Sequence, residues 1–275
     1  MTNIEPHPKG LAAFRIGRME RFSWHFIDTY IVTRRNLIDF MRQPSLVLFS
    51  VIQPVMFLIV FTYVFGGAIK LVTGGDYISF LLPGIIIQTM VFASTNTAVG
   101  LALDLSLGLI QRFRSLPMSR AAVLAGRTSA DTIRGALTIL IMIATGYLIG
   151  FRIDDWTNGM LGFLLAVAFG HAFTWIGAAI GLFLKNPATA QVAGFVWLVP
   201  VTFVSSIFIP PFTMPDWLRV FADNQPVSVV ANATRGLMMG SPDMDSIVLS
   251  IIWIVGIMLV FVPLTVWEYA RAVSH

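Results

Sequence analysis

Six long apolar stretches divide this chain, and their length restricts what it can fold into. A hydrocarbon core of about 30 Å takes about 20 helical residues to cross. The stretches cover residues 47–66, 78–101, 135–151, 161–184, 192–210 and 247–268. Hydrophobic residues make up 56% of the sequence and charged residues 12%, with a mean hydropathy of +0.80, unlike a soluble domain. The pattern predicts an all-α integral membrane protein with six transmembrane helices.

Ionisable residues are nearly missing from these stretches, which bears on the energy source of any transport. His171 and Glu268 are the two that they contain. A proton- or sodium-driven transporter needs intramembrane carboxylates or bases that bind the coupling ion. The sequence also has no GxxxxGK[ST] phosphate loop, so the chain does not bind ATP by that route. These features favour a membrane channel-former whose energy comes from a separate partner.

Several other classes of function find little support. There is no cysteine, which excludes disulfides, thiolate nucleophiles and Cys-ligated metals. A membrane-embedded enzyme needs convergent catalytic groups, yet there is no HExxH motif and no Ser-His pair obviously at one depth. The first 21 residues are polar and charged, so no cleavable signal peptide is expected.

Charge placement orients the chain in the membrane. Most of the 18 basic residues lie before the first stretch and between the second and third, while the alternate segments hold few. The positive-inside rule therefore predicts that both termini are cytoplasmic. The pI of 9.8 is a topology signal in this reading, and nucleic-acid binding is a poor explanation for it.

The N-terminal region, residues 1–46, contains a candidate interfacial helix at 22–42. On a helical wheel its apolar residues gather on one side: Trp24, Ile27, Tyr30, Ile31, Leu37, Ile38 and Met41. The polar residues lie largely opposite, which predicts a helix in the plane of the membrane surface. Pro44 separates this helix from the first stretch. A simple surface anchor and a contact with a cytoplasmic partner remain open as its role.

The cytoplasmic segment 102–134 alternates aliphatic and basic residues in an ordered way. Asp104 favours a helix start and Pro117 a stop, which predicts a compact knob below the membrane. Downstream, Arg127, Asp131 and Arg134 share one helix face, so Asp131 is placed to pair with both arginines. A merely solvated basic loop is the alternative.

The outward segment 211–246 contains two apolar runs too short to span. Pro215 and Pro226 each suit a first helical turn, and Gly240 suits the cap of the second helix. We therefore expect two re-entrant or interfacial helices buried against protein before the last span.

Polar and small residues inside the stretches predict helix contacts or a cavity. Gln88, Thr95 and Asn96 share one helix face, and Ser205 lies in the fifth stretch; packing against other helices and contact with cargo both explain them. The GxxxG pairs Gly146/Gly150 and Gly177/Gly181 favour close helix approach. His171 is expected to hydrogen-bond a neighbour rather than to bind a metal.

Two motifs are specific enough to suggest a family. One is GLIQRFRSLPMSR at 108–120; the other combines PDWL at 215–218, NQP at 224–226, RG at 235–236 and Gly240. With the order of the parts, they resemble the membrane permease subunit of type-2 ABC exporters, particularly the daunorubicin-resistance-like permeases of actinobacteria. The resemblance covers nearly the whole chain.

The resemblance implies an architecture and partners. The region 47–275 would be a six-span type-2 ABC transmembrane domain in the inner (plasma) membrane of a bacterium, among membrane lipids. The permease would pair with a second copy or a related permease, and two ABC ATPase subunits would bind ATP and Mg, with no cofactor in this chain. Residues 102–120 would form the coupling segment and 22–42 the connecting helix beside it. Coupling to the ATPase is implied for Arg112, Phe113, Arg114, Leu116, Pro117 and Met118.

The resemblance also implies a cargo class and a pathway. The expected function is outward transport of amphipathic drugs or lipid-like compounds, with cargo against the first, second and fifth spans. Gln88, Asn96 and Ser205 are the candidate pathway residues. Export of a cell-envelope lipid or polysaccharide precursor is an alternative, and an ion-gradient-driven transporter is a further one.

Overall fold

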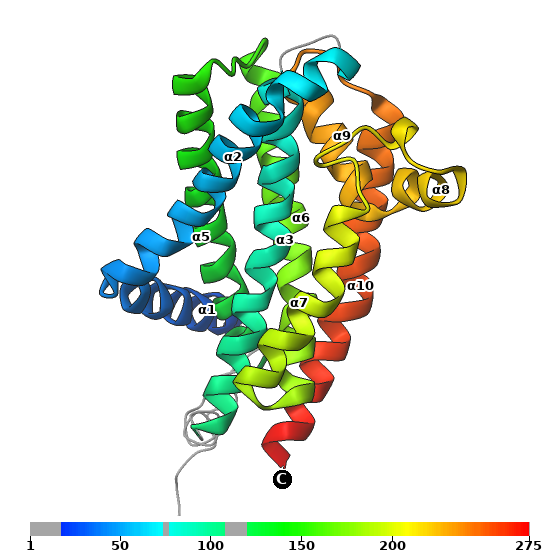
Figure 1. Ribbon diagram of the computed structural model, residues 1–275. Helices are drawn as coiled ribbons and strands as arrows, with labels where there is room; N and C mark the ends of the chain where they lie inside the picture. The colour runs from blue at the N-terminus through cyan, green and yellow to red at the C-terminus, as the bar shows by residue number, and fades with distance from the viewer. Residues whose placement is uncertain (1–17, 74–76, 108–119, 275) are drawn as a thin grey trace, which may run out of the picture.

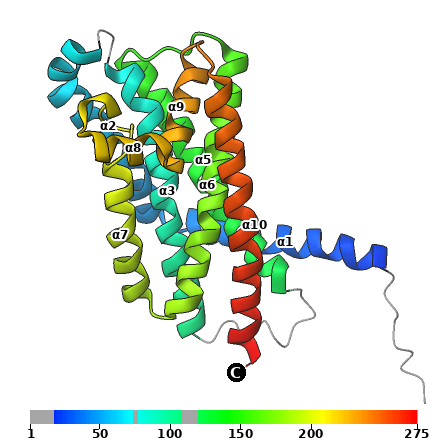
Figure 2. The same cartoon turned by 90° about the vertical axis from the view of Figure 1, so that its right-hand side faces the viewer.

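The computed structural model describes residues 18–73, 77–107 and 120–274, and every regular element within these ranges is helical. The elements are α1 (Arg18–Met41), α2 (Pro44–Thr73), α3 (Tyr77–Ser106), α5 (Arg120–Ile149), α6 (Trp156–Leu184), α7 (Pro187–Phe203), η1 (Pro211–Thr213), α8 (Asp216–Asn224), α9 (Pro226–Met238) and α10 (Met244–Ser274). The long helices form a bundle, and α1 lies across its axis (Figures 1 and 2).

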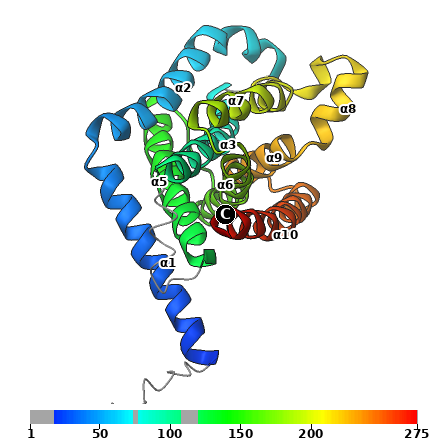
Figure 3. The ribbon, with the colours of Figure 1, turned by 90° about the horizontal axis from the view of Figure 1, so that it is seen from below.

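The centre of the bundle is α3, which the view along the axis shows surrounded by other helices (Figure 3). It packs against α2, α5, α6, α7 and α9, and it is buried through most of its length from Tyr77 to Ala102. No charged residue precedes Asp104 in this helix. A helix that is apolar on all sides suits such a position. By contrast, Leu58 is the one buried side chain among those described in α2.

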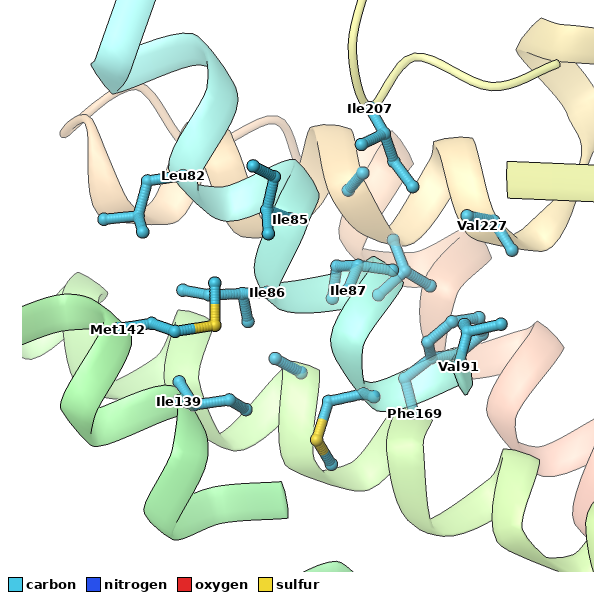
Figure 4. Close-up of a cluster of buried hydrophobic side chains, with 14 of the residues drawn as sticks. Leu82, Ile85, Ile86, Ile87, Val91, Ile139, Met142, Phe169, Ile207 and Val227 are labelled. Carbon is cyan, nitrogen blue, oxygen red and sulfur yellow. The ribbon is translucent and has the colours of Figure 1, made fainter. Parts of the chain in front are cut away.

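The core of the bundle forms where aliphatic side chains of α3 meet α5, α6, α9 and the segment after α7. Those labelled in Figure 4 are Leu82, Ile85, Ile86, Ile87, Val91, Ile139, Met142, Phe169, Ile207 and Val227. Lipid tails are as apolar as these side chains, so close packing rather than exclusion of water holds such helices together.

The closest packing is between α3 and α6, at the glycines of the second GxxxG pair. A Cβ at Gly177 would lie 2.0 Å from the carbonyl oxygen of Ser94, and one at Gly181 would lie 2.3 Å from that of Ala98. Because the obstacle is backbone in both cases, no side chain fits at either position. The predicted close approach is confirmed for this pair.

The first GxxxG pair behaves differently. A Cβ at Gly146 would lie 2.6 Å from Cδ2 of Leu82, so this glycine does face a neighbour. Gly150 has open space around it and a φ of +116°, which glycine adopts without steric cost. It follows the last residue of α5 and ends that helix, so the prediction of a close-approach pair is wrong for Gly150.

Short polar side chains fix where the helices start. Asp155 accepts hydrogen bonds from the backbone N–H groups of the first turn of α6, and Asn186 does the same for α7. Asp243 caps α10, and hydrogen bonds from the hydroxyl and N–H of Ser246 hold the pKa of its carboxyl below the usual value. Pro44 starts α2 directly after α1, as expected.

Five helices in the described ranges are long and apolar enough to cross a membrane. They are Val47–Gly67, Tyr77–Ser106, Ala121–Ile149, Trp156–Leu184 and Met244–Arg271. These helices confirm five of the six predicted spans as elements, but the third one begins well before residue 135. Residues 121–134, predicted to be cytoplasmic, continue the same helix, and their charged side chains are paired rather than solvated.

The predicted span 192–210 is wrong in its bounds. The helix, α7, starts at Pro187 and ends at Phe203 after 17 residues, fewer than the about 20 that a crossing takes. The following residues are not helical, although Ser205 to Phe208 are buried. A Cβ at Gly84 of α3 would lie 2.7 Å from the carbonyl oxygen of Ile207, so this irregular segment packs directly on α3.

The two short helices predicted in the outward segment are present as α8 and α9. Pro215 precedes α8, Pro226 starts α9, and Gly240 follows α9 with a φ of +67°. The helices differ in their surroundings. α9 is largely buried against α3, α6 and α10, whereas α8 packs on α9 and η1 at the edge of the bundle (Figures 1 and 3). α8 exposes Trp217 and Phe221, so the prediction of burial against protein is wrong for this helix.

Candidate coupling and transport sites

A salt bridge joins α3 to α5 at the start of the predicted coupling segment. Nη1 of Arg127 on α5 donates to Oδ2 of Asp104 on α3. The two side chains are 18% and 19% exposed, so most of each charged group is removed from solvent. Gly100 leaves space for the guanidinium, because a Cβ there would lie 1.7 Å from Nη2 of Arg127. Asp104 lies in the last turn of α3, so the prediction that it starts a helix is wrong.

A second polar contact lies two turns further along α3, toward the bundle centre. Oγ1 of Thr97 donates to Oδ2 of Asp131 over 2.8 Å, and Nη1 of Arg134 donates to Oδ1 of Asp131 over 2.9 Å. The predicted pairing of Asp131 with Arg134 is confirmed. Arg127 pairs instead with Asp104, because α3 brings that carboxylate within its reach. We call Thr97, Gly100, Asp104, Arg127 and Asp131 the α3–α5 junction.

The polar face of α1 packs against α5. Nη2 of Arg134 donates to the carbonyl oxygen of Asn36 over 2.6 Å, and the guanidinium carbon lies 4.5 Å from the centre of the Phe40 ring. Oγ1 of Thr33 donates to the carbonyl oxygen of Gly126 over 3.0 Å. Arg134 therefore links the α3–α5 junction to α1 through Asp131.

The apolar face of α1 is left open, as the predicted amphipathic pattern requires. Ile27, Tyr30, Ile31 and Met41 are all half exposed or more. Views from the side and along the axis show α1 extending beyond the bundle (Figures 2 and 3). Such a face suits the boundary between headgroups and acyl chains.

The six predicted coupling residues, from Arg112 to Met118, lie outside the described residues. The structure describes the two helices that precede and follow this segment. α3 ends at Ser106 and α5 begins at Arg120, so the α3–α5 junction stands directly at the base of the segment.

The three candidate pathway residues have different surroundings. Gln88 is buried at 8% exposure, whereas Asn96 is exposed. Ser205 is fully buried, donates to the carbonyl oxygen of Thr202 over 2.5 Å and accepts from the N–H of Ile207 over 3.2 Å. Its hydroxyl thus stabilises the chain where α7 ends. Thr95, on the predicted face with Gln88, is buried and its Oγ1 has no hydrogen-bond partner.

The side chain of His171 on α6 faces α5, and both of its ring nitrogens are hydrogen-bonded, as expected. Nε1 of Trp175 lies 3.2 Å from Nε2 of His171, and Nδ1 lies 2.8 Å from Oγ1 of Thr132. An indole N–H only donates, so Nε2 accepts and the ring proton is on Nδ1. Nδ1–H then donates to Thr132, whose hydroxyl donates to the carbonyl oxygen of Thr128 over 2.8 Å. The chain of bonds fits a neutral imidazole and leaves no free nitrogen for a coupling ion.

This bonding predicts the outcome of truncating the histidine. We expect His171→Ala to lower the free energy of unfolding by about 2 kcal/mol, because it removes two hydrogen bonds and leaves the Trp175 N–H unpaired. Thermal unfolding in detergent measures the loss, and Thr145→Ala, which removes a bond within one helix turn, is the control. NMR of the labelled imidazole should report the Nδ1–H tautomer; the other tautomer would contradict the assignment.

The sequence patterns did not predict a cluster of polar side chains on α9 and on the segments beside it. It comprises Ser206, Gln225, Ser228, Asn232 and Arg235, and we call it the α9 polar cluster. Nε2 of Gln225 donates to the carbonyl oxygen of Val201 in the last turn of α7 over 3.0 Å, and to that of Val204, the residue after the helix. Gln225 therefore caps α7 and explains why the helix stops at this point.

Arg235 ties α9 to both neighbouring segments. Its Nε donates to the carbonyl oxygen of Phe80 on α3 over 2.9 Å, and its Nη2 donates to that of Ser206 over 2.9 Å. Nη1 donates to Oδ1 of Asn232 over 2.7 Å, and the guanidinium lies 3.8 Å from the centre of the Phe80 ring. The NQP and RG motifs at 224–226 and 235–236 contain two members of this cluster. They were the available signal, although their spacing alone does not reveal the contacts.

These features define a helical membrane protein of several spans, with a charged junction at one end of its bundle and short packed helices at the other. The chain belongs to the ABC-2 type transporter family, whose model matches residues 28–239. It is a permease subunit of an ABC exporter, and membership implies that nucleotide binds to a separate ATPase partner. The resemblance drawn from the sequence is thus confirmed.

The chain is similar to several permeases over most of its length. It is 34% identical over 242 residues to the daunorubicin resistance ABC transporter permease protein DrrB1 of Streptomyces coeruleorubidus, covering 88% of this chain and 85% of that protein. It is 29% identical over 250 residues to the probable doxorubicin resistance ABC transporter permease protein DrrC of Mycobacterium tuberculosis, covering 90% of each. Identity to the doxorubicin resistance permease DrrB of that organism is 28% over 209 residues, 70% of this chain and 71% of that one.

Proposed function

We propose that this permease moves amphipathic drugs or lipid-like compounds outward, driven by ATP hydrolysis in two separate ABC ATPase subunits. The observation that carries the proposal is the similarity to a daunorubicin resistance permease across 88% of the chain. The hydrogen-bonded, neutral His171 supports an energy source outside the membrane domain, because neither of its ring nitrogens is free to bind a coupling ion.

The proposed topology has six crossings and cytoplasmic termini, in the inner membrane of a bacterium. Five helices are candidate spans, and α7 would complete a sixth crossing together with the re-entrant α9. In Figure 1, α1 and the C-terminal end of α10 lie toward one end of the bundle, and α8 and α9 lie toward the other. With the positive-inside rule, this arrangement favours a cytoplasmic α1 and an outward α9.

The part of residues 102–120 that follows α3 would seat in the ATPase, with α1 beside it as connecting helix. The permease would pair with a second copy or with a related permease. The occurrence of DrrB- and DrrC-type relatives in one organism supports pairing with a related permease. Closure of the ATPase dimer on ATP would then push the segment held between α3 and α5.

We expect charge reversal in the coupling segment to abolish transport. The double variant Arg112→Glu, Arg114→Glu places acids where basic side chains would meet the ATPase, and like-charge contacts at an interface are unfavourable. Membrane insertion should be unchanged, since neither residue belongs to one of the apolar stretches of the sequence. The matched control is Arg219→Glu on exposed α8. Export by the double variant at the parental rate would remove the coupling role of this segment.

The proposed function is tested with the complex isolated from its native membrane. Mass spectrometry should identify a co-purifying subunit with a phosphate loop, and in proteoliposomes that complex should move an amphipathic dye when ATP is added. Transport that survives ATP depletion but stops with an uncoupler would overturn the proposal in favour of a gradient-driven transporter.

A further inference from the structure

We infer that the Asp104–Arg127 pair is the positioning contact that makes α3 and α5 move together when the coupling segment is displaced. The inference rests on the proposed function and adds a role for two residues that neither bind ATP nor face a known cargo. It starts from the place of the pair, which joins the two helices that hold residues 107–119.

The junction is built to favour this one pairing. Each side chain is more than four-fifths removed from solvent, so separating the pair leaves two largely buried charges without the contact that joins them, and only Asp104 keeps a second arginine, Arg35, beside it. Space for the guanidinium exists because position 100 is glycine. The contact therefore depends on three positions, Gly100, Asp104 and Arg127, brought together from two helices.

The contact continues away from the coupling segment in a connected series. Thr97 of α3 donates to Asp131 of α5, Asp131 pairs with Arg134, and Arg134 donates to the carbonyl oxygen of Asn36 on α1. A displacement of either helix end is thus shared by α3, α5 and α1. Without the Asp104–Arg127 pair, one end of the segment is free to shift while the other stays in place, and less of the motion reaches the spans.

The test is transport per ATP hydrolysed, measured for the full permease with its co-purified ATPase in proteoliposomes with an amphipathic dye. Arg127→Asp and Asp104→Arg should each lower this ratio about tenfold while ATP hydrolysis continues, and the swapped double variant should restore most of it. A role in stability alone would change the amount of folded protein and leave the ratio as in the parent. Single variants with the parental ratio, or a folded swapped variant without recovery, would overturn the inference.

Two milder variants keep the test decisive if the charge reversals fail to fold. Gly100→Ala changes no charge but displaces the guanidinium, and Arg127→Lys keeps the charge but replaces the planar guanidinium by a compact ammonium group. Both should lower the ratio, and a parental ratio in both would overturn the inference. Gly256→Ala on α10, where an added Cβ meets no atom within 4 Å, is the control. A parent complex that moves the dye without ATP would instead refute the proposed function, which separates the two failures.

Discussion

We expect Gly177→Leu to lower the stability of the helix bundle by about 3 kcal/mol, at the upper end of the usual cost of overpacking. The reason is the kind of atom that the new side chain meets. A Cβ at this position would lie 2.0 Å from the carbonyl oxygen of Ser94 on α3, and backbone does not rotate aside as a side chain does. Relief requires α6 to move away from α3, which would also open the contact of Gly181 with Ala98 one turn further on.

The matched control for this substitution is Gly256→Leu on α10. An added Cβ there meets no atom within 4 Å, so the same change in size and helix propensity occurs without a clash. Thermal unfolding of both variants in detergent separates the two effects. Equal melting temperatures for the two variants would show that the α3–α6 contact is not as close as the structure has it.

The presence of the long helices was predictable because it depends on local composition. The C-terminal end of α7 was not, because it depends on a residue far away along the chain. The apolar stretches predicted five candidate spans, and short caps such as Asp155 and Asn186 lie beside the helices they start. The end of α7 is different. Gln225, more than 20 residues away along the chain, satisfies its last carbonyl oxygens, and no local pattern marks such a partner.

The charged residues of α5 show the same limit for the candidate site: spacing within one helix does not reveal a partner on another helix. Their spacing correctly placed Arg127, Asp131 and Arg134 on a helix, and one of the two predicted pairs formed. Arg127 found its carboxylate on α3 instead, because burial requires each charge to take whichever partner the packing brings near. Because the apolar stretch begins only after these charges, the predicted third span started at residue 135, whereas the candidate span begins at Ala121.

Helical spacing did not predict which of the candidate pathway residues are buried, and their role in transport stays a prediction. Gln88, Thr95 and Asn96 share a face on a wheel, yet Gln88 and Thr95 are buried and Asn96 is exposed. Thr95 and Asn96 are consecutive and lie about 100° apart around α3, so the edge of the buried surface of α3 runs between them. Polarity alone therefore does not separate a cavity-facing side chain from one that packs between helices.

Arg235→Ala is expected to lower the stability of the protein by about 3 kcal/mol and to loosen α9 from the bundle. The substitution removes the guanidinium donor from the carbonyl oxygens of Phe80 and Ser206 and from Oδ1 of Asn232, which keeps only its bond from the Ser206 hydroxyl. Lysine should not rescue the loss, because a single ammonium group does not reach three acceptors in the planar arrangement of a guanidinium.

The control for Arg235 is another arginine of the outward segment in an ion pair that solvent reaches. Arg219 lies 3.4 Å from Asp223 on α8, with half of its side chain exposed, and Arg219→Ala should cost less than about 1 kcal/mol. Thermal unfolding measures the stabilities, and hydrogen exchange of α9 measures its attachment to α3. If Arg235→Lys matched the parent in both measurements, a point charge would suffice and the forked contacts would not be what holds α9 in place. If instead exchange rises in α9 and the adjoining residues 204–210 while α5 and α6 stay protected, Arg235 is the residue that fixes the outward helices onto α3.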